Sequence, residues 1–164
     1  MRLLFVHGAG GYVEDRVLAD ALADQLGARL MMPRLPDEDM SVAAWAGPIA
    51  RALEDLSADD AVVAHSFGAT ILLHVLGTAH EPPERATLLA MPDWGPEGWD
   101  VADYVLPVQT PGVELTLHHC RDDEVVPFGH LALAAARLPD ARIVTHDVGG
   151  HQFEGRAADL AARV

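Results

Sequence analysis

The sequence predicts an α/β fold, in the form of a three-layer α/β/α sandwich around a mainly parallel sheet of about six strands. Short apolar runs alternate with amphipathic stretches along the whole 164-residue chain, and this alternation is typical of strand–helix–strand units. The chemically notable residues follow the ends of the apolar runs, where parallel α/β sheets bind their ligands. No repeat or low-complexity segment interrupts the rhythm, so residues 1–164 are expected to form one domain.

Six apolar runs provide the expected strands, at residues 2–6, 28–32, 60–65, 86–91, 113–119 and 142–147. Helices are expected at residues 13–26, after an N-cap at Ser41, and at residues 67–77, 129–138 and 152–163. The first helix is expected to bury one apolar face, made of Val13, Val17, Leu18, Ala21, Leu22 and Leu26. Pro48 lies inside the second helix and is expected to kink or split it.

Residues 92–112 form a segment rich in proline and glycine that interrupts the alternation of strands and helices. A loop of this length inside a compact domain is usually functional or disordered, and its Trp94, Trp99 and Tyr104 argue for an ordered segment. We interpret it as a short flap over the functional site, with Trp94, Trp99 and also Phe128 as candidate substrate-binding residues. The alternative is that both tryptophans only cover an exposed edge of the sheet.

Composition and charge exclude several classes of function. The net charge of −14 would repel nucleic acids and anionic membrane surfaces, so neither is expected as a partner. The chain has no lysine, which excludes Schiff-base chemistry and the lysine of a phosphate-binding loop. It also has no asparagine, which excludes a Cys-His-Asn catalytic set. Cys120 is the single cysteine, and no run resembles a signal peptide or a membrane span, so a cytoplasmic location is expected.

The most informative motif is Ala64-His-Ser-Phe-Gly68, between a strand-like apolar run and a helix-like run. A serine flanked two positions away by very small residues, at a strand-to-helix junction, is typical of a nucleophile elbow. The turn is so tight that neither flanking position has room for a bulky side chain. The usual pattern has glycine at both positions, so Ala64 is a departure from it. Ser66 is the candidate nucleophile.

A serine nucleophile needs a histidine to accept its proton and a carboxylate to orient that histidine. Both follow Ser66 in the order Ser–Asp–His, each at the end of a different expected strand. The carboxylate is Asp122 or Asp123, just past residues 113–119, and the histidine is His151 on a glycine-rich loop. Taken singly, these are ordinary turn and loop residues, but together and in this order they indicate a catalytic triad.

The first expected strand runs into His7-Gly-Ala-Gly-Gly11, a glycine-rich loop that opens a helix. Its backbone N–H groups can face a developing oxyanion, and the N–H of Phe67, directly after the serine, can supply a second donor. The competing interpretation is a dinucleotide-binding loop. It is weak, because Val13 stands where the third glycine belongs, and Glu14 and Asp15 would repel a pyrophosphate.

A resemblance to a known family rests on five segments: Val6-His-Gly-Ala-Gly-Gly11, Ala64-His-Ser-Phe-Gly68, Trp94 to Trp99, Arg121-Asp-Asp-Glu-Val-Val-Pro127 and Gly149-Gly-His-Gln-Phe153. Together they resemble the α/β-hydrolase superfamily, and more narrowly its small serine hydrolases of the YdeN and retinoblastoma-binding-protein-nine type. The resemblance covers nearly the whole chain and implies a minimal α/β-hydrolase fold. It implies Ser66 as nucleophile, Asp123 as acid and His151 as base. It further implies oxyanion donors at Ala9 and Phe67.

The expected function is hydrolysis of a small-molecule ester or thioester through an acyl-enzyme intermediate. Two alternatives keep the same fold: a non-catalytic module that binds a ligand or a protein, and an acyltransferase that uses the same triad. No cofactor is expected. No metal site is expected either, because the consecutive His118, His119 and Cys120 lack the spacing of zinc ligands.

Overall fold

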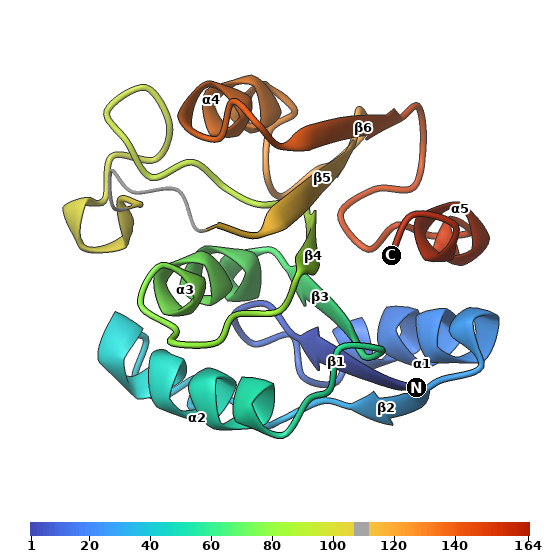
Figure 1. Cartoon of the computed structure of the whole chain (residues 1–164). Coiled ribbons are helices and arrows are strands. Elements are labelled where there is room, and N and C mark those ends of the chain that lie inside the picture. The colour runs from blue at the N-terminus through green and yellow to red at the C-terminus, as the bar shows by residue number, and fades with distance from the viewer. Residues whose placement is uncertain (107–111) are drawn as a thin grey trace.

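A sheet of six parallel strands forms the middle layer of the part of the chain that the structure describes, residues 1–106 and 112–164 (Figure 1). The structure is a computed structural model. The strand order is β2-β1-β3-β4-β5-β6, and every neighbouring pair is parallel. The strands are β1 (Arg2–Val6), β2 (Arg29–Met31), β3 (Ala61–His65), β4 (Arg85–Leu89), β5 (Glu114–Cys120) and β6 (Arg142–His146). This sheet confirms the predicted α/β fold class.

Helices cover both faces of the sheet (Figure 1). They are α1 (Asp15–Leu26), α2 (Val42–Glu54), α3 (Phe67–Leu76), α4 (Gly129–Arg137) and α5 (Ala157–Ala161), with a short 3₁₀ helix η1 at Ala102–Tyr104. Helices α2, α3 and α4 pack on one face and α1 and α5 on the other, which gives the expected three layers. Within the described ranges, no helix combines the length and the apolar character needed to cross a membrane.

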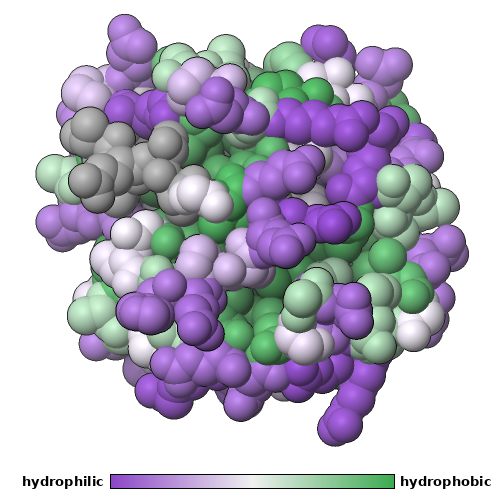
Figure 2. Space-filling model, viewed as in Figure 1, coloured by the Kyte–Doolittle hydropathy of each residue, from purple (hydrophilic) through white to green (hydrophobic). Residues whose placement is uncertain are grey.

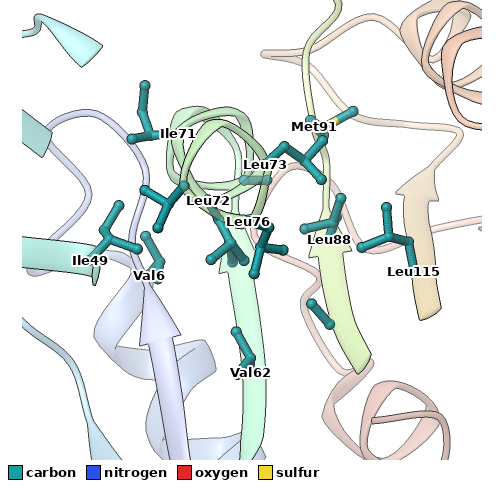
Figure 3. Close-up of a cluster of buried hydrophobic side chains, with 14 of the residues drawn as sticks. Val6, Ile49, Val62, Ile71, Leu72, Leu73, Leu76, Leu88, Met91 and Leu115 are labelled. Atoms are coloured by element: carbon teal, nitrogen blue, oxygen red, sulfur yellow. The ribbon is translucent and has the colours of Figure 1, made fainter. Parts of the chain in front are cut away.

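Alternate residues of the central strands belong to two separate cores, because successive side chains of a strand point to opposite faces. In β1, Leu4 and Val6 belong to the core under α2, α3 and α4, which Figure 3 shows from close by. Leu3 and Phe5 belong to the core under α1 and α5. Burial on both faces explains why the central strands read as unbroken apolar runs. On the outside, hydrophilic side chains cover most of the face seen in Figure 2, and apolar groups show mainly in hollows between them.

Helix α1 buries only part of the face that the sequence predicts, including Leu18 and Leu22. The predicted face includes Val13 and Val17, but each of them is 77% exposed, and that part of the prediction is wrong. The helix begins at Asp15 and buries Asp15, Leu18, Ala19, Leu22 and Ala23. We attribute this orientation to Asp15, because its carboxylate is almost completely buried and accepts the N–H of Gly8 at 2.7 Å.

Helix α2 begins after the predicted N-cap. The Oγ atom of Ser41 accepts the N–H of Ala44 at 3.2 Å, which satisfies one of the unpaired donors of the first turn. Pro48 lies inside the helix, yet the helix runs unbroken from Val42 to Glu54. The predicted split therefore does not occur.

The last helix is shorter than predicted. Helix α5 begins at Ala157 and not at residue 152. Phe153 and Gly155 have φ angles of 53° and 71°, values that lie outside the right-handed helical region. Residues 152–155 consequently form a turn, which separates the predicted catalytic histidine, His151, from helix α5.

Candidate active site

Ser66 lies at the junction of β3 and α3, in a backbone conformation that residues other than glycine rarely adopt. Its φ is 54° and its ψ is −124°, and such strain is found mainly at functional sites. The N–H of Ser66 donates to the carbonyl oxygen of Leu89 at 2.8 Å, which ties the turn to β4. A Cβ atom at Gly68 would overlap the carbonyl oxygen of His7, so only glycine fits there. The segment therefore has the tight, strained turn that a nucleophile elbow requires.

A cavity of about 350 Å³ opens beside Ser66, and we call it the Ser66 cavity. His151 also lines it, so the predicted nucleophile and base face the same space. Two groups of side chains account for much of the lining. The polar cluster consists of Asp15, His65, His151 and Gln152. The aromatic cluster consists of Phe67, Trp94, Trp99 and Tyr104.

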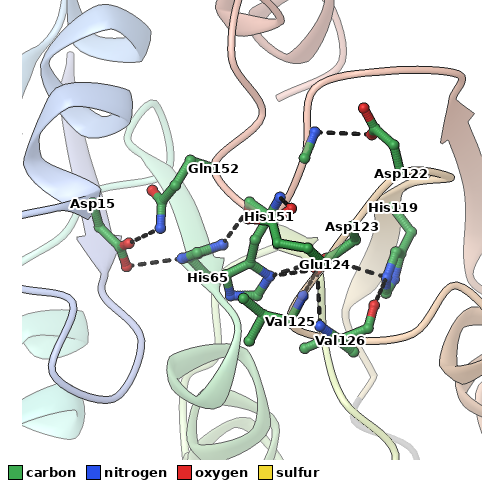
Figure 4. A network of polar contacts seen from close by, with 11 residues as sticks. Asp15, His65, His119, Asp122, Asp123, Glu124, Val125, Val126, His151 and Gln152 are labelled. Carbon is green, nitrogen blue, oxygen red and sulfur yellow. Dashed lines mark hydrogen bonds and ion pairs between the residues drawn. The ribbon is translucent and has the colours of Figure 1, made fainter.

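His151 and Asp123 are directly hydrogen-bonded (Figure 4). Nδ1 of His151 lies 2.9 Å from Oδ2 and 3.1 Å from Oδ1 of Asp123, whose side chain is fully buried. Oδ1 also accepts the N–H groups of Val125 and Val126, at 2.9 and 2.8 Å. Nε2 of His119 lies 3.4 Å from Oδ2. These contacts hold the carboxylate in one orientation against the imidazole of His151.

The same contacts keep Asp123 ionised. Burial by itself raises the pKa of Asp123, but hydrogen bonds from His119, His151 and two backbone N–H groups outweigh burial and hold that pKa well below its usual value. An ionised Asp123 favours the tautomer of His151 that carries its proton on Nδ1, which leaves Nε2 as a proton acceptor. In residues 1–106 and 112–164, no group is hydrogen-bonded to Nε2 of His151, whose Nδ1 alone is engaged.

The structure brings Asp123, and not Asp122, to the histidine. Asp122 accepts the N–H groups of Gly149 and Gly150, at 3.2 and 2.9 Å, and so holds the loop that carries this histidine. The N–H of Gly150 is the main cause that lowers the pKa of Asp122. Both glycines have positive φ, 144° and 59°, and a Cβ atom at Gly149 would lie only 2.9 Å from Sγ of Cys120. The loop conformation thus depends on this glycine pair.

Most backbone N–H groups of the glycine-rich loop after β1 already have acceptors. Gly8 donates to Oδ2 of Asp15 at 2.7 Å. Gly10 donates to Oδ1 of Asp37 at 2.7 Å. Gly11 donates to the carbonyl oxygen of Gly8 at 3.0 Å.

Two predicted oxyanion donors remain near Ser66. Ala9 lines the Ser66 cavity, and no described residue accepts its N–H. Phe67 lines the same cavity and is the first residue of α3, so its N–H has no acceptor within the helix.

Asp15 and Gln152 belong to the polar cluster, although no sequence motif marks either of them as a site residue. Oδ1 of Asp15 accepts Nε2–H of Gln152 at 3.0 Å, and Oδ2 of Asp15 lies 2.8 Å from Nδ1 of His65. One signal for Asp15 is present in the sequence. It lies in the first turn of the helix that the glycine-rich loop opens, where a side chain points back toward the loop.

Contacts between rings hold the aromatic cluster together. The ring centroid of Trp94 lies 4.8 Å from that of Tyr104, 4.9 Å from Trp99 and 5.9 Å from Phe67, all in edge-to-face arrangements. Nε1–H of Trp94 donates to Oγ1 of Thr70 at 2.8 Å, which fixes the indole over α3. Both tryptophans that are predicted to bind substrate line the Ser66 cavity. The side chain of Trp99 is 39% exposed.

The beginning of the proline-rich segment is anchored to α4. The carboxylate of Asp93, which is almost fully buried, forms an ion pair with Arg137 and accepts the N–H of Gly95 at 2.9 Å. The N–H of Asp93 donates to Nδ1 of His130 at 2.9 Å. Residues 107–111 of the predicted flap lie outside the described residues.

Phe128, the third candidate for substrate binding, is not among the residues that line the Ser66 cavity. Its ring packs edge-to-face against His119 at a centroid distance of 5.8 Å. The guanidinium of Arg121 lies over the Phe128 ring, 4.7 Å from the ring centroid. The structure therefore places Phe128 against a neighbour of Asp123.

The two consecutive histidines of β5 have different surroundings. Nδ1 of His118 lies 3.0 Å from Nε2 of His146, and burial lowers the pKa of His118 to about 3. Nε2 of His119 lies 2.9 Å from the carbonyl oxygen of Val126. Over residues 1–106 and 112–164, no three potential metal-ligating side chains lie close enough together to hold an ion.

Solved structures with the same fold include several hydrolases. The ydeN gene product from B. subtilis matches with a TM-score of 0.75 and 16% identity, over 98% of this chain and 96% of that one. A serine hydrolase from Cycloclasticus zankles matches with a TM-score of 0.72 and 14% identity, over 99% and 86% of the two chains. Est1E from Butyrivibrio proteoclasticus, with ferulic acid bound, matches with a TM-score of 0.73 and 13% identity, over 99% and 86%.

Sequence similarity identifies the family to which this chain belongs. Among curated proteins, none matches this sequence significantly. These three structures share 13–16% of their residues with this chain, so by themselves they establish the α/β-hydrolase fold and nothing finer. The model of the serine hydrolase family, in contrast, matches residues 4–155 and so spans both the strained serine turn and the histidine loop. The protein belongs to the serine hydrolase family.

Proposed function

We propose that the protein hydrolyses an ester or thioester of a small molecule through an acyl-enzyme intermediate. Ser66 is the nucleophile, His151 the general base and Asp123 the residue that orients His151. The observation that carries the proposal is the buried Asp123–His151 hydrogen bond of 2.9 Å beside a cavity that a strained serine also lines. This is the arrangement that turns a weakly nucleophilic hydroxyl into a reactive one.

The first half of the reaction forms the acyl-enzyme. Oγ of Ser66 attacks the carbonyl carbon of the substrate while Nε2 of His151 takes the hydroxyl proton. Asp123 stays ionised and stabilises the imidazolium that forms, because its bond to Nδ1 strengthens when the ring becomes charged. Collapse of the tetrahedral intermediate breaks the bond to the leaving alcohol or thiol, which takes the proton from His151.

The second half regenerates the enzyme. Nε2 of His151 takes a proton from water, the water oxygen attacks the acyl carbon, and the proton returns to Oγ of Ser66 as the acid leaves. In both halves the negative oxygen needs donors at a fixed position. The N–H groups of Ala9 and Phe67 suit this role, since both residues line the Ser66 cavity while Gly8 and Gly10 donate elsewhere.

The aromatic cluster supports a substrate with an apolar acyl or alcohol group. Trp94, Trp99 and Tyr104 offer ring surface beside the serine, and apolar groups bind such surface by the hydrophobic effect. The lining includes no arginine among the described residues, so an uncharged substrate fits better than one that carries phosphates. The small-molecule ligand of the neighbour Est1E is in line with a substrate of modest size.

Labelling with a fluorophosphonate probe tests the proposal. We expect labelling at one residue, its complete loss in Ser66→Ala, and an unchanged fold by circular dichroism. Ser41→Ala and Ser57→Ala are matched controls that should still be labelled, because Ser41 caps α2 and the Ser57 hydroxyl donates to Asp60. Labelling that persists in Ser66→Ala would refute the assigned nucleophile.

A panel of p-nitrophenyl esters of different chain length then measures turnover. Release of p-nitrophenol above the background rate supports hydrolysis. No labelling and no turnover would favour a module that binds ligands without catalysis. Transfer of the acyl group to an added alcohol in preference to water would identify an acyltransferase.

A further inference from the structure

A single buried carboxylate joins three segments of the active site. Asp15 is 1% exposed and lies at the first residue of α1. Its Oδ2 accepts the N–H of Gly8 at 2.7 Å and lies 2.8 Å from Nδ1 of His65, the residue directly before Ser66. Its Oδ1 accepts Nε2–H of Gln152, the residue directly after the catalytic histidine, at 3.0 Å (Figure 4).

The hydrogen bonds of His65 specify its protonation state. Nδ1 faces the carboxylate of Asp15 at 2.8 Å, and Nε2 lies 2.9 Å from the carbonyl oxygen of His151. Both partners are acceptors, and a neutral imidazole has only one N–H to donate. Both hydrogen bonds form together only when His65 is an imidazolium. The ring is 1% exposed, and the carboxylate beside it supplies the countercharge.

The state of Asp15 agrees with this assignment. Burial alone raises the pKa of a carboxyl group, but in Asp15 the hydrogen bond and the charge of His65 outweigh burial, and the pKa is lower than usual. The N–H of Gly8 and the amide of Gln152 act in the same direction. The carboxylate is therefore ionised, and every partner that reaches it is a donor.

We propose that Asp15 and His65 form a buried ion pair that positions the oxyanion loop, the nucleophile and the base relative to one another. The inference rests on the proposed hydrolase mechanism and adds to it two positioning residues outside the triad. The pair acts on the loop through the N–H of Gly8, which leaves the neighbouring N–H of Ala9 for the oxyanion. It acts on the base through the carbonyl oxygen of His151, whose ring centroid lies 4.6 Å from that of His65.

An ion pair suits this task better than apolar packing. Burying two charges costs free energy that their attraction only partly returns, so such a pair adds little to stability. It does impose direction, because each N–H donor must point at one particular oxygen atom. Small errors in the placement of reacting groups have large effects on rate, about 100-fold for a misplacement on the order of 1 Å. The expected effect of the pair is therefore on turnover and not on binding.

Steady-state kinetics of Asp15→Asn provide the first test. The amide keeps the size of the side chain but removes the charge, and its nitrogen cannot accept a hydrogen bond. We expect kcat per active site to fall about 10- to 100-fold, with KM for p-nitrophenyl acetate changed less than about twofold. Asp20→Asn is the matched control, because it removes an exposed carboxylate from the same helix, where the side chain of Asp20 bonds that of Arg16.

Two readouts separate positioning from general stability. Active sites are titrated with the fluorophosphonate probe, so that kcat refers to folded enzyme only, and Tm is measured for each variant. A lower Tm with unchanged kcat per titrated site would overturn the proposal. In the double variant Asp15→Asn/His65→Gln, we expect no greater loss than in the worse single variant, because the pair acts as a unit. Multiplicative losses would also overturn it.

The charge on His65 can be measured without any substrate. In ¹⁵N spectra of the imidazole rings near neutral pH, with the resonances assigned by His65→Gln, both nitrogens of His65 should carry protons, and Asp15→Asn should remove one of them. A neutral His65 in the unaltered protein would overturn the inference whatever the activity. Conversely, an imidazolium signal in a protein that no fluorophosphonate labels would contradict the proposed function while leaving the ion pair in place.

Discussion

The two clusters that line the Ser66 cavity are built by different kinds of interaction. Each member of the polar cluster is fixed by hydrogen bonds, such as those of Asp15 to Gly8, His65 and Gln152. The aromatic cluster is held mainly by edge-to-face ring contacts such as that of Trp94 with Trp99. Hydrogen bonds fix direction, whereas ring contacts offer area and tolerate small shifts. We therefore expect changes in the polar cluster and its partners to alter kcat, and changes in the aromatic cluster to alter KM.

The largest effect is expected from Asp123→Asn. An asparagine amide can donate to Nδ1 of His151 and so stabilise the tautomer that cannot accept the serine proton. We expect kcat to fall by up to about 10⁴-fold, with little change in KM for p-nitrophenyl acetate. Asp147→Asn is the control, since it removes a carboxylate that is 94% exposed. A loss that appears in KM and not in kcat would break the proposed division between the two clusters.

Trp94→Ala and Trp99→Ala test the aromatic cluster. Each should raise KM for medium-chain p-nitrophenyl esters more than for the acetate, because longer chains contact more apolar surface. The loss of transition-state binding should be about 1–3 kcal/mol, and larger for Trp94, which is less exposed and contacts three other rings. If Tm falls while the chain-length preference stays the same, both indoles only cover the sheet and do not bind substrate.

The smallest effect is expected from Asp122→Asn, which alters the loop that carries His151 but leaves the Asp123–His151 bond in place. The folded-state pKa of Asp122 is lower than its unfolded value because Gly150 and Gly149 donate to it. Its contribution to stability is therefore complete above the ordinary aspartate pKa of about 3.9 and is lost as the pH falls below it. The variant cannot titrate there, so its Tm should drop less between about pH 6 and pH 3.

Thermal melts of both proteins at the two pH values check this prediction. At neutral pH we expect kcat of Asp122→Asn to stay within a few-fold of the original enzyme, because the histidine keeps its carboxylate. An equal drop in Tm for both proteins would show that Asp122 does not stabilise the folded loop. A loss of kcat close to that of Asp123→Asn would show that the loop position matters as much as the tautomer.

The sequence best predicts those features of the fold and the site that depend on residues close together in the chain. The four central strands, β1, β3, β4 and β5, follow from apolar runs buried on both faces, and Ser66 follows from small residues around a tight turn. Asp123 could be separated from Asp122 only by the family resemblance, since both directly follow the same strand. The structure separates them by the direction of each side chain, toward His151 or toward Gly149 and Gly150.

What the sequence misses depends on segments that are far apart in the chain. Asp15 gains its place from residues 8, 65 and 152, which meet only in the folded sheet. The same contacts set the rotation of α1, so Val13 and Val17 stay exposed despite their apolar character. Phe128 shows the opposite kind of error. An aromatic residue suits a binding site, but the turn before α4 directs the Phe128 ring to His119.

Cys120 has a practical consequence. The thiol is fully buried beneath the turn at Gly149, and burial raises its pKa to about 12. Maleimides and iodoacetamides react with the thiolate, which at neutral pH is almost absent from this site. A cysteine introduced as Trp99→Cys at the exposed rim of the cavity would then be the one thiol open to these reagents. A fluorophore attached there could report substrate entry in real time, with the native cysteine left untouched.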